Sequence, residues 1–389
     1  MRIGLALLCF AYVLSQFYRT FLAVLTGPLA EDIGAGPEDL ALASGLWFLV
    51  FAAMQVPVGS ALDRVGPRRT ASVLLLVGGG GGALVFAVAQ APWHVSLAMA
   101  LLGVGCAPVL MAAYYIFARV YPPALFASLA AAVLGIGTLG NLFAAMPVTA
   151  AAETIGWRAT MWVLAAVSAL TALGIGVLVK DPPPAQQGTG GSFLDLFRIP
   201  ALWLVFPIAI ANYAPAAGVR GLWIGPYLRE TYGADPATVG WAATAMGLAM
   251  IAGSFAYGPA DRWFGTRKWV IFTGNAGALL ALVALILLPP MGVWTTTALF
   301  ALLGFCAASY PLVMAHGRAF VPDHLAGRGV ALLNLLAIGT VGLTQVASGR
   351  LYSPGITPPE AAFQPVLLLY AGLLALALAI YLLARDRTD

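Results

Sequence analysis

Twelve apolar runs, each close to the length that crosses a lipid bilayer, limit this chain to one class of fold. A bilayer core requires about 20 consecutive apolar residues in a helix. It offers no water to an exposed backbone, so runs of this length must cross as helices. We therefore expect an all-α membrane protein with twelve transmembrane helices. They are placed at about 4–29, 40–61, 70–90, 94–117, 126–149, 157–179, 200–227, 237–259, 269–289, 293–315, 328–349 and 364–384.

The composition agrees with residence in lipid. Of the 389 residues, 61% are hydrophobic and 9% are charged, whereas a soluble domain carries about 25% charged residues. The first run begins at Ile3 and is too long for the hydrophobic region of a signal peptide, so we expect it to remain as the first span. Cys9, Cys106 and Cys306 lie inside apolar runs, and their spacing predicts neither a disulfide framework nor a metal site.

One long polar segment interrupts the series of spans. Residues 180–200, with the sequence KDPPPAQQGTGGSFLDLFRIP, have the Pro, Gly and Gln content of a linker. The segment leaves six spans before it and six after it. We expect an N-terminal six-helix bundle over 1–179, a linker over 180–199 and a C-terminal six-helix bundle over 200–389.

The basic residues between the spans lie almost entirely on one side. With a cytoplasmic N-terminus, the outer side receives only Arg158, Arg229 and Arg350. Loops rich in Lys and Arg stay in the cytoplasm, so both termini and the linker are expected there, in a protein of the cell inner membrane. Because the basic residues lie beside the membrane, the pI near 9.0 does not indicate nucleic acid as a partner. We expect a monomer.

The two halves repeat each other. The loop GSALDRVGPRR, from Gly59 to Arg69, returns as GPADRWFGTRK, from Gly258 to Lys268. The fifth span contains IGTLG and the eleventh contains IGTVG. Repeats in corresponding places of two halves are a feature of transporter folds, so the two bundles are expected to be pseudo-symmetric.

Two arginines lie in the middle of apolar spans. Arg19 is in the first span and Arg220 in the seventh, and each follows a tyrosine, Tyr12 or Tyr213, by seven residues. A guanidinium at the centre of a bilayer costs about 2.5–3.5 kcal/mol on insertion scales, so such a residue is expected to face a cavity or a partner. One cation from each half predicts a site for an anion.

The repeated loop resembles the signature loop of the major facilitator superfamily, and that resemblance covers the whole chain. Within the superfamily, YVLSQFYRTFLAVLTGPLAEDIG is similar to the first span of the organophosphate:phosphate antiporters. The seventh span is also similar to theirs, with Trp223, Tyr227, Leu228, Arg229 and Glu230 in the run W-x-x-x-Y-L-[KR]-E. This resemblance implies a secondary transporter in which Arg19 and Arg220 hold the substrate's phosphoryl group.

The chain departs from that family at three positions. Gln55 stands where the family has a lysine, the segment around Gly137 and Thr138 lacks a histidine, and Gly247 replaces a glutamate. A site that keeps two cations and loses auxiliary charge favours a monoanion or a dicarboxylate, and a phosphate ester remains an alternative. The head group is therefore expected to be a carboxylate, a phosphate or a sulfonate.

The repeated loops also predict a gate. An aspartate at a helix end can accept hydrogen bonds from a neighbouring helix, and arginines nearby can pair with acids in one conformation and release them in another. The candidate gating residues are Asp63, Arg64, Arg68, Asp261, Arg262 and Arg267.

Other polar and aromatic residues at span depth are candidates to line the substrate cavity or to hold helices together. Besides the two tyrosines, they are Gln16, Trp47, Gln55, Tyr114, Asn141, Tyr310 and Asn334. No acid lies at the centre of a span, which favours exchange or facilitated diffusion of the anion, with proton symport as an alternative.

The sequence offers less support for function classes other than anion transport. The chain carries no nucleotide-binding loop or zinc-protease motif, so we expect neither an enzyme nor a cofactor. Met246 and Met250 are one helical turn apart, a spacing that suits Cu(I), and a soft-metal importer is one alternative. A sensor with a transporter fold, or an exporter of drugs or metabolites, is another.

Overall fold

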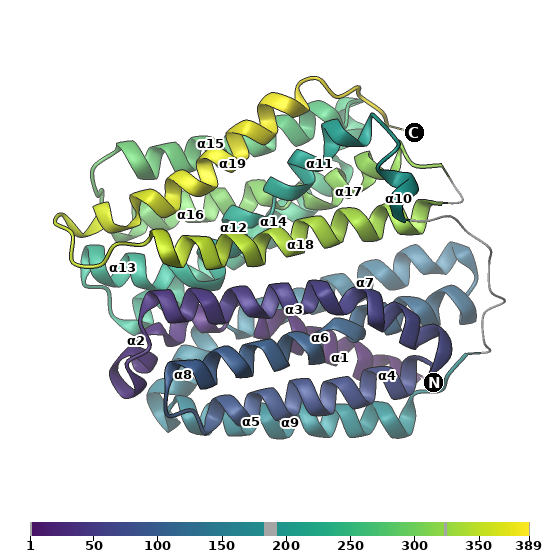
Figure 1. The fold of residues 1–389 in the computed structure, drawn as a ribbon, viewed down its shortest axis with the longest axis horizontal. Coiled ribbons are helices and arrows are strands. Elements are labelled where there is room, and N and C mark those ends of the chain that lie inside the picture. The colour runs from purple at the N-terminus through teal and green to yellow at the C-terminus, as the bar shows by residue number, and fades with distance from the viewer. Residues whose placement is uncertain (1, 183–192, 323–324, 389) are drawn as a thin grey trace. The chain divides into compact units, whose positions relative to one another are not determined.

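The computed structural model describes residues 2–182, 193–322 and 325–388. The chain divides into two compact units, Met1–Gln187 and Gly188–Asp389. Each unit is a bundle of helices (Figure 1), and no strand occurs among the described residues. The prediction of an all-α membrane fold is confirmed.

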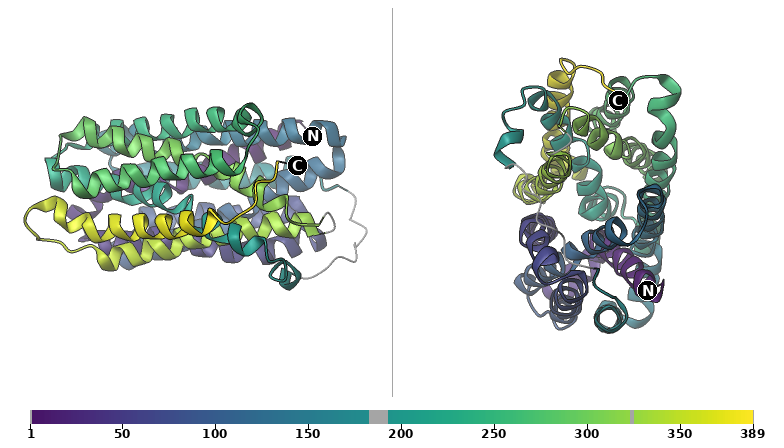
Figure 2. Two further views of the ribbon diagram at one scale, coloured as in Figure 1. Left: turned by 90° about the horizontal axis from the view of Figure 1, so that it is seen from above. Right: turned by 90° about the vertical axis from the view of Figure 1, so that its right-hand side faces the viewer.

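Long helices that lie side by side build the first unit (Figure 2). Its elements are α1 (Arg2–Tyr18), α2 (Leu22–Ile33), α3 (Pro37–Arg64), α4 (Pro67–Leu74), the π-helical turn η1 (Leu75–Gly80), α5 (Gly81–Ala87), α6 (Pro92–Val120), α7 (Pro123–Phe143), α8 (Met146–Ile155) and α9 (Trp157–Leu178).

The described part of the second unit begins with a short helix. Its first span is divided into more helical segments than the first span of the first unit. Its elements are α10 (Phe193–Leu196), α11 (Leu202–Ala211), α12 (Ala214–Gly218), the π-helical turn η2 (Val219–Trp223), α13 (Ile224–Tyr232), α14 (Pro236–Phe264), α15 (Lys268–Leu287), α16 (Val293–Ala307), α17 (Tyr310–Arg318), α18 (Ala326–Leu351), the 3-10 turn η4 (Pro359–Phe363) and α19 (Gln364–Tyr381).

The number of spans agrees with the sequence. Within the described ranges, ten helices are long and apolar enough to cross a membrane, and two bent helix pairs bring the number to twelve if each pair is one span. The pair α1 and α2 bends by 54°, and the pair formed by 132–143 and α8 bends by 41°. The spans expected at about 4–29 and 126–149 were predicted without these bends.

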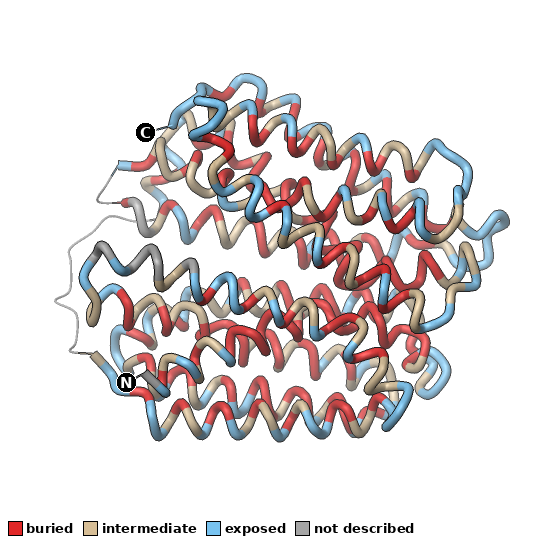
Figure 3. The backbone as a smooth tube through the Cα atoms, turned by 180° about the vertical axis from the view of Figure 1, so that it is seen from behind, coloured by how far each residue is buried: buried red, intermediate tan, exposed pale blue. Residues whose placement is uncertain are grey.

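Most helices present one buried and one exposed face, as Figure 3 shows by colour. The exposed faces carry large apolar side chains such as Leu170, Val177 and Phe255, which are 68%, 78% and 78% exposed. In a soluble protein such apolar faces would mark contact sites. In a membrane protein such apolar faces are suited to contact with lipid.

Glycines bring two spans of the first unit into backbone contact. A Cβ atom added to Gly105 in α6 would overlap the backbone of Gly79 in η1, and one added to Gly78 would overlap Gly105. Small residues allow this approach between membrane helices. Gly78, Gly79 and Gly105 therefore serve packing between the third and fourth spans.

Candidate functional site

Arg19 lies at the bend of the first span, between α1 and α2. Its Cζ atom is 5.2 Å from the ring centroid of Trp47 and 5.6 Å from that of Phe51. These two rings stack on α3 with centroids 5.0 Å apart and an interplanar angle of 13°. A guanidinium near an aromatic face is attracted by the ring's quadrupole. The bend thus places Arg19 beside a pair of stacked rings, and its side chain stays half-buried.

Tyr12 lies two turns before Arg19 and is buried against α7. It accepts a hydrogen bond of 2.9 Å from the amide of Gln16, and a Cβ atom on Gly137 would overlap its ring. Tyr114 of α6 packs against the same core cluster as Tyr12. The structure therefore brings together Tyr12, Gln16 and Tyr114, three of the predicted lining residues of this half.

Two further candidates of the first half lie close to the Arg19 bend. Thr20 donates a hydrogen bond of 3.5 Å to the Oδ1 atom of Asn141. Gln55 donates one of 3.2 Å to the backbone oxygen of Phe51, the residue whose ring lies near Arg19. Trp47 itself is fully buried, so it supports the guanidinium from within the bundle.

Arg220 lies in the π-helical turn η2 and is 3% exposed. Its guanidinium lies against the backbone of Gly247 in α14. A Cβ atom added to Gly247 would stand 2.8 Å from Nη2 and 3.4 Å from Cζ of Arg220. Tyr213 is close enough to interact electrostatically with the guanidinium. π-helical turns are rare and often occur at functional sites.

The seventh span is interrupted at Asn212 and Tyr213, between α11 and α12. The Asn212 amide donates hydrogen bonds to Asn275 and Ser309, at 2.8 and 2.9 Å, and all three residues are buried. Farther along the span, Trp223 donates to Ser348 at 2.9 Å. These side-chain bonds to α15, α18 and the turn before α17 hold the broken span in place.

Three predicted lining residues of the second half form one group. The rings of Tyr213 and Tyr310 have centroids 5.5 Å apart. The Tyr310 hydroxyl donates a hydrogen bond of 2.7 Å to Oδ1 of Asn334 on α18. Since Tyr213 also lies near Arg220, the group extends from the guanidinium towards α17 and α18.

In the first half, the signature loop 63–69 is tied to α6 and to the chain after α9. Asp63 forms an ion pair of 3.6 Å with Arg119, whose guanidinium lies 3.3 Å from the ring centroid of Tyr115. Asp181 accepts a hydrogen bond of 2.8 Å from the backbone N–H of Arg68, and Arg64 is exposed. Neither Arg119 nor Asp181 is among the gating residues predicted from the sequence.

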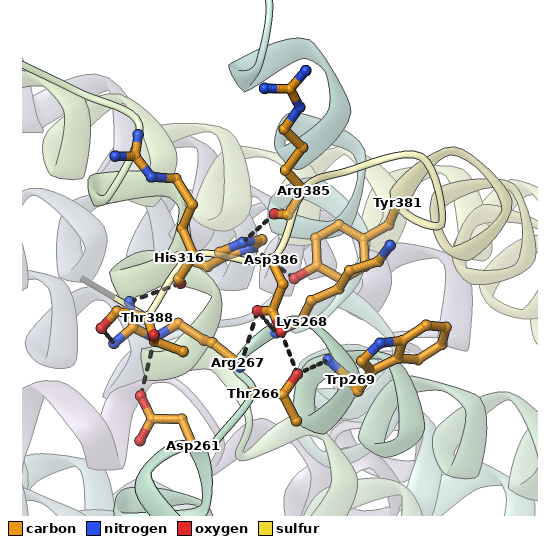
Figure 4. A network of polar contacts seen from close by, with 11 residues as sticks. Asp261, Thr266, Arg267, Lys268, Trp269, His316, Tyr381, Arg385, Asp386 and Thr388 are labelled. Carbon is orange, nitrogen blue, oxygen red and sulfur yellow. Dashed lines mark hydrogen bonds and ion pairs between the residues drawn. The ribbon is translucent and has the colours of Figure 1, made fainter. Parts of the chain in front are cut away.

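In the second half, the loop 261–268 binds the C-terminal tail (Figure 4). Nε of Arg267 donates to Asp261 at 3.0 Å, and its terminal nitrogens donate to the carbonyl oxygens of Arg387 and Thr388, at 3.3 and 3.1 Å. Beside this network is a pocket of about 560 Å³, lined by Gly258, Asp261, Arg262, Gly265, Arg267, Leu312, Ala315 and Thr388. Arg262 is exposed at its edge.

Asp386 caps the start of α15. Its carboxylate accepts hydrogen bonds from Thr266 at 2.5 Å, from the N–H of Arg267 at 3.1 Å and from the N–H of Lys268 at 2.8 Å. Partial burial opposes ionisation, but these hydrogen bonds prevail and hold the pKa of Asp386 below its usual value. The tail is therefore part of the loop structure.

His316 is fully buried at the end of α17. One ring nitrogen, Nε2, lies 3.0 Å from the backbone oxygen of Arg385, and the other, Nδ1, lies 2.7 Å from the Tyr381 hydroxyl. A carbonyl only accepts, so Nε2 carries the hydrogen, and in the neutral ring Nδ1 accepts from Tyr381. His316 thus joins α19 and the tail to α17.

Met246 and Met250 both pack on Gly304 of α16. Their Cγ atoms stand 3.1 and 2.9 Å from the place where a Cβ of Gly304 would be. Met246 is fully buried. The close contact of α14 with α16 accounts for the spacing of the two methionines.

The sequence profile of the major facilitator superfamily matches residues 8–223 and again residues 205–389. No curated protein matches the chain by sequence similarity.

Solved transporter structures share the fold at low sequence identity. A bacterial homologue of the human lysosomal transporter Spinster, inward-facing and unoccupied, aligns with a TM-score of 0.78 at 18% identity, over 98% of this chain and 96% of its own. A mutant of the nucleoside transporter NupG gives 0.78 at 15%, over 98% and 99%. A D-xylose–proton symporter gives 0.77 at 13%, over 98% and 97%.

Proposed function

The chain belongs to the major facilitator superfamily, and we propose that it moves a small organic anion across the membrane by alternating access, with Arg19 and Arg220 as the two cations that bind it. Each half supplies one of these arginines from its first span. An anion lowers the electrostatic cost of a cation held away from water, so the bound substrate favours the closed conformation.

The observation that carries the proposal is the placement of Arg220. A guanidinium that is 3% exposed lies in a π-helical turn, and the span carries no other charged residue between Arg198 and Arg229. Arg19 lies at the bend of the matching span of the other half. A planar guanidinium keeps its charge and can bind two oxygens of one carboxylate or phosphate. Both features suit recognition of an anionic head group.

The head group is best matched by a carboxylate, a sulfonate or a phosphate. The likeness to organophosphate:phosphate antiporters supports phosphate, whereas the loss of auxiliary charge at Gln55 and Gly247 supports a monoanion or a dicarboxylate. Acids are absent from the span centres of the sequence, which supports exchange above proton coupling. We place the protein in the inner membrane with both termini in the cytoplasm, as the distribution of Lys and Arg supports.

The loops 63–69 and 261–268 are assigned to the gate. The Asp63–Arg119 ion pair ties the first loop to α6. The Asp261–Arg267 pair lies within the second loop, and Arg267 joins that loop to the C-terminal tail. Contacts of this kind can hold one conformation and release another. The gate would therefore control the rate of the conformational change rather than the affinity for substrate.

Thermal unfolding of the purified protein tests the proposal. The panel contains succinate, glycerol 3-phosphate, inorganic phosphate and ethanesulfonate, with xylose, choline and Cu(I) as non-anionic probes. A ligand present at 100 times its Kd stabilises the bound state by about 2.7 kcal/mol. We expect an anion to raise Tm, and we expect Arg19→Ala and Arg220→Ala each to abolish that rise.

Lysine variants separate charge from geometry. Arg19→Lys and Arg220→Lys keep the positive charge but lose the bidentate fork, so we expect little rescue. Anion-induced stabilisation that survives in both alanine variants, or a best ligand that is neutral or cationic, contradicts the proposal. A response to Cu(I) lost on Met246→Leu would support the soft-metal alternative instead.

A further inference from the structure

We infer that Gly247 determines the specificity of the Arg220 half of the site, by leaving the space in which the guanidinium lies. This inference rests on the proposed function. Arg220 and Gly247 belong to the same unit, so the contact does not depend on how the two halves are arranged. Both residues are buried.

The contact is steric and local. A Cβ atom on Gly247 would be 2.8 Å from Nη2, 3.4 Å from Cζ and 3.5 Å from Nε of Arg220. A separation below 3 Å between a carbon and a nitrogen is repulsive, so any side chain at 247 must displace the guanidinium. The π-helical turn η2, which contains Arg220, is held by the Trp223–Ser348 hydrogen bond. This bond limits how far the backbone of Arg220 can move to relieve the overlap.

The position of this cation decides which head groups it can bind. Bidentate hydrogen bonding requires the planes of guanidinium and carboxylate to align, and Tyr213 lies near the same guanidinium. A cation moved away from α14 is therefore moved relative to the Tyr213–Tyr310–Asn334 group. Gly247 acts through Arg220, as a positioning residue.

Two other glycines of this unit provide matched controls. Gly253 lies on the same helix, but its added Cβ would stand 2.5 Å from the backbone oxygen of Phe305, so Gly253→Ala disturbs packing away from Arg220. Gly372 in α19 has open space around it and is exposed, so Gly372→Ala adds only the conformational benefit of alanine in a helix.

A double-mutant cycle on the ligand-free protein tests the contact itself. Gly247→Ala is expected to lower Tm by about 2 °C or more in the wild-type background. In the Arg220→Ala background the same change should raise Tm, as we expect of Gly372→Ala, because the guanidinium is gone. Equal effects of Gly247→Ala in both backgrounds would overturn the contact.

Anion binding then tests specificity, with the same panel of succinate, glycerol 3-phosphate, inorganic phosphate and ethanesulfonate. Gly247→Ala should raise the Kd of the best anion about tenfold, or about 1.4 kcal/mol, and change the order of preference. Gly247→Asp should abolish binding while the protein stays folded, since its carboxylate competes for the cation. Gly253→Ala should lower Tm and leave the order unchanged.

The outcomes separate the inference from the proposed function. If Arg220→Ala binds the anions as the wild type does, the proposed function fails. If Arg220→Ala loses binding while Gly247→Ala keeps the wild-type affinities and order, the proposed function stands and the role of Gly247 is refuted.

Discussion

Asp386 and Asp181 hold equivalent places in the two halves, each just beyond the last helix of its unit and each bonded to the loop between the second and third spans of that unit. Asp181 accepts from the N–H of Arg68 at 2.8 Å. Asp386 accepts from the matching N–H of Arg267 at 3.1 Å. Each repeated loop is therefore joined to the end of its own bundle.

The two halves differ in how they use the loop arginine. In the second half, the Arg267 side chain bridges Asp261 and the tail carbonyl groups. In the first half, Asp63 pairs instead with Arg119 of α6. The aspartates of the repeat are thus both engaged, but by cations from different elements, and the two gates need not respond alike to the same mutation.

Removing the Asp386 cap should destabilise the second half. Asp386→Ala is expected to lower the free energy of unfolding by about 1 kcal/mol, the usual value for loss of a carboxylate or hydroxyl cap at a helix start. Asp386→Asn keeps an acceptor oxygen and should lose less. Thermal unfolding of both variants measures the difference, and an unchanged Tm for Asp386→Ala would show that the cap contributes nothing.

The same carboxylate predicts a pH dependence. The pKa of Asp386 is lower in the folded protein than in the unfolded chain, where an aspartate titrates near about 3.9. The stabilisation is therefore complete above the unfolded pKa and is lost as the pH falls through the folded pKa. An aspartate titrates within the range from about pH 6 to about pH 3. As the pH falls through this range, Asp386→Asn should lose less stability than the wild type. Parallel curves would contradict this.

The features that could be predicted from the sequence depend on local composition. The spans could be predicted from apolar runs, because the bilayer imposes their length. The repeated loops could be predicted because the same residue types recur in both halves. The 54° bend at Arg19 and the π-helical turn at Arg220 could not be predicted. The hydrogen bond that holds η2 joins Trp223 to Ser348, and no local sequence pattern indicates a contact between residues so far apart in the chain.

The candidate site, too, could be predicted from the sequence only in part. The rarity of charge inside a span indicated Arg19 and Arg220. The grouping of Tyr213, Tyr310 and Asn334 required the three-dimensional structure, since these residues come from three separate spans. Asp181 and Asp386 resemble ordinary loop acids in the sequence, because no sequence pattern identifies the backbone N–H groups that each of them binds.

Gly140 should be intolerant of any side chain. A Cβ atom there would overlap the backbone oxygen of Val13 and stand 2.9 Å from the backbone nitrogen of Phe17, so α1 and α7 would have to separate. We expect Gly140→Ala to destabilise the protein by about 1–3 kcal/mol. Gly135→Ala, on the same helix with open space around it, should be neutral or stabilising by about 0.5–1 kcal/mol. Equal stability of the two variants would be inconsistent with the helix contact.

Asp63→Asn should slow transport more than it weakens binding. The Asp63 side chain is 62% exposed and its pair with Arg119 spans 3.6 Å, a kind of contact that adds little to stability. Its loss should therefore leave Tm nearly unchanged and alter the rate of conformational exchange. Anion uptake into proteoliposomes gives the rate, and thermal shift gives the Kd. A large loss of affinity with normal turnover would count against a gating role.

Trp47 should act on anion binding through Arg19. Its ring lies 5.2 Å from the guanidinium carbon, and a cation–π contact contributes about 0.5–2 kcal/mol, depending on desolvation. Trp47→Phe and Trp47→Leu both lose buried volume, but only the leucine loses the aromatic face. We expect the Kd of the best anion to be about two- to fivefold higher for the leucine variant than for the phenylalanine variant. Equal Kd values for the two variants, each with a lowered Tm, would assign Trp47 to packing alone and leave Phe51 as the ring that orients Arg19.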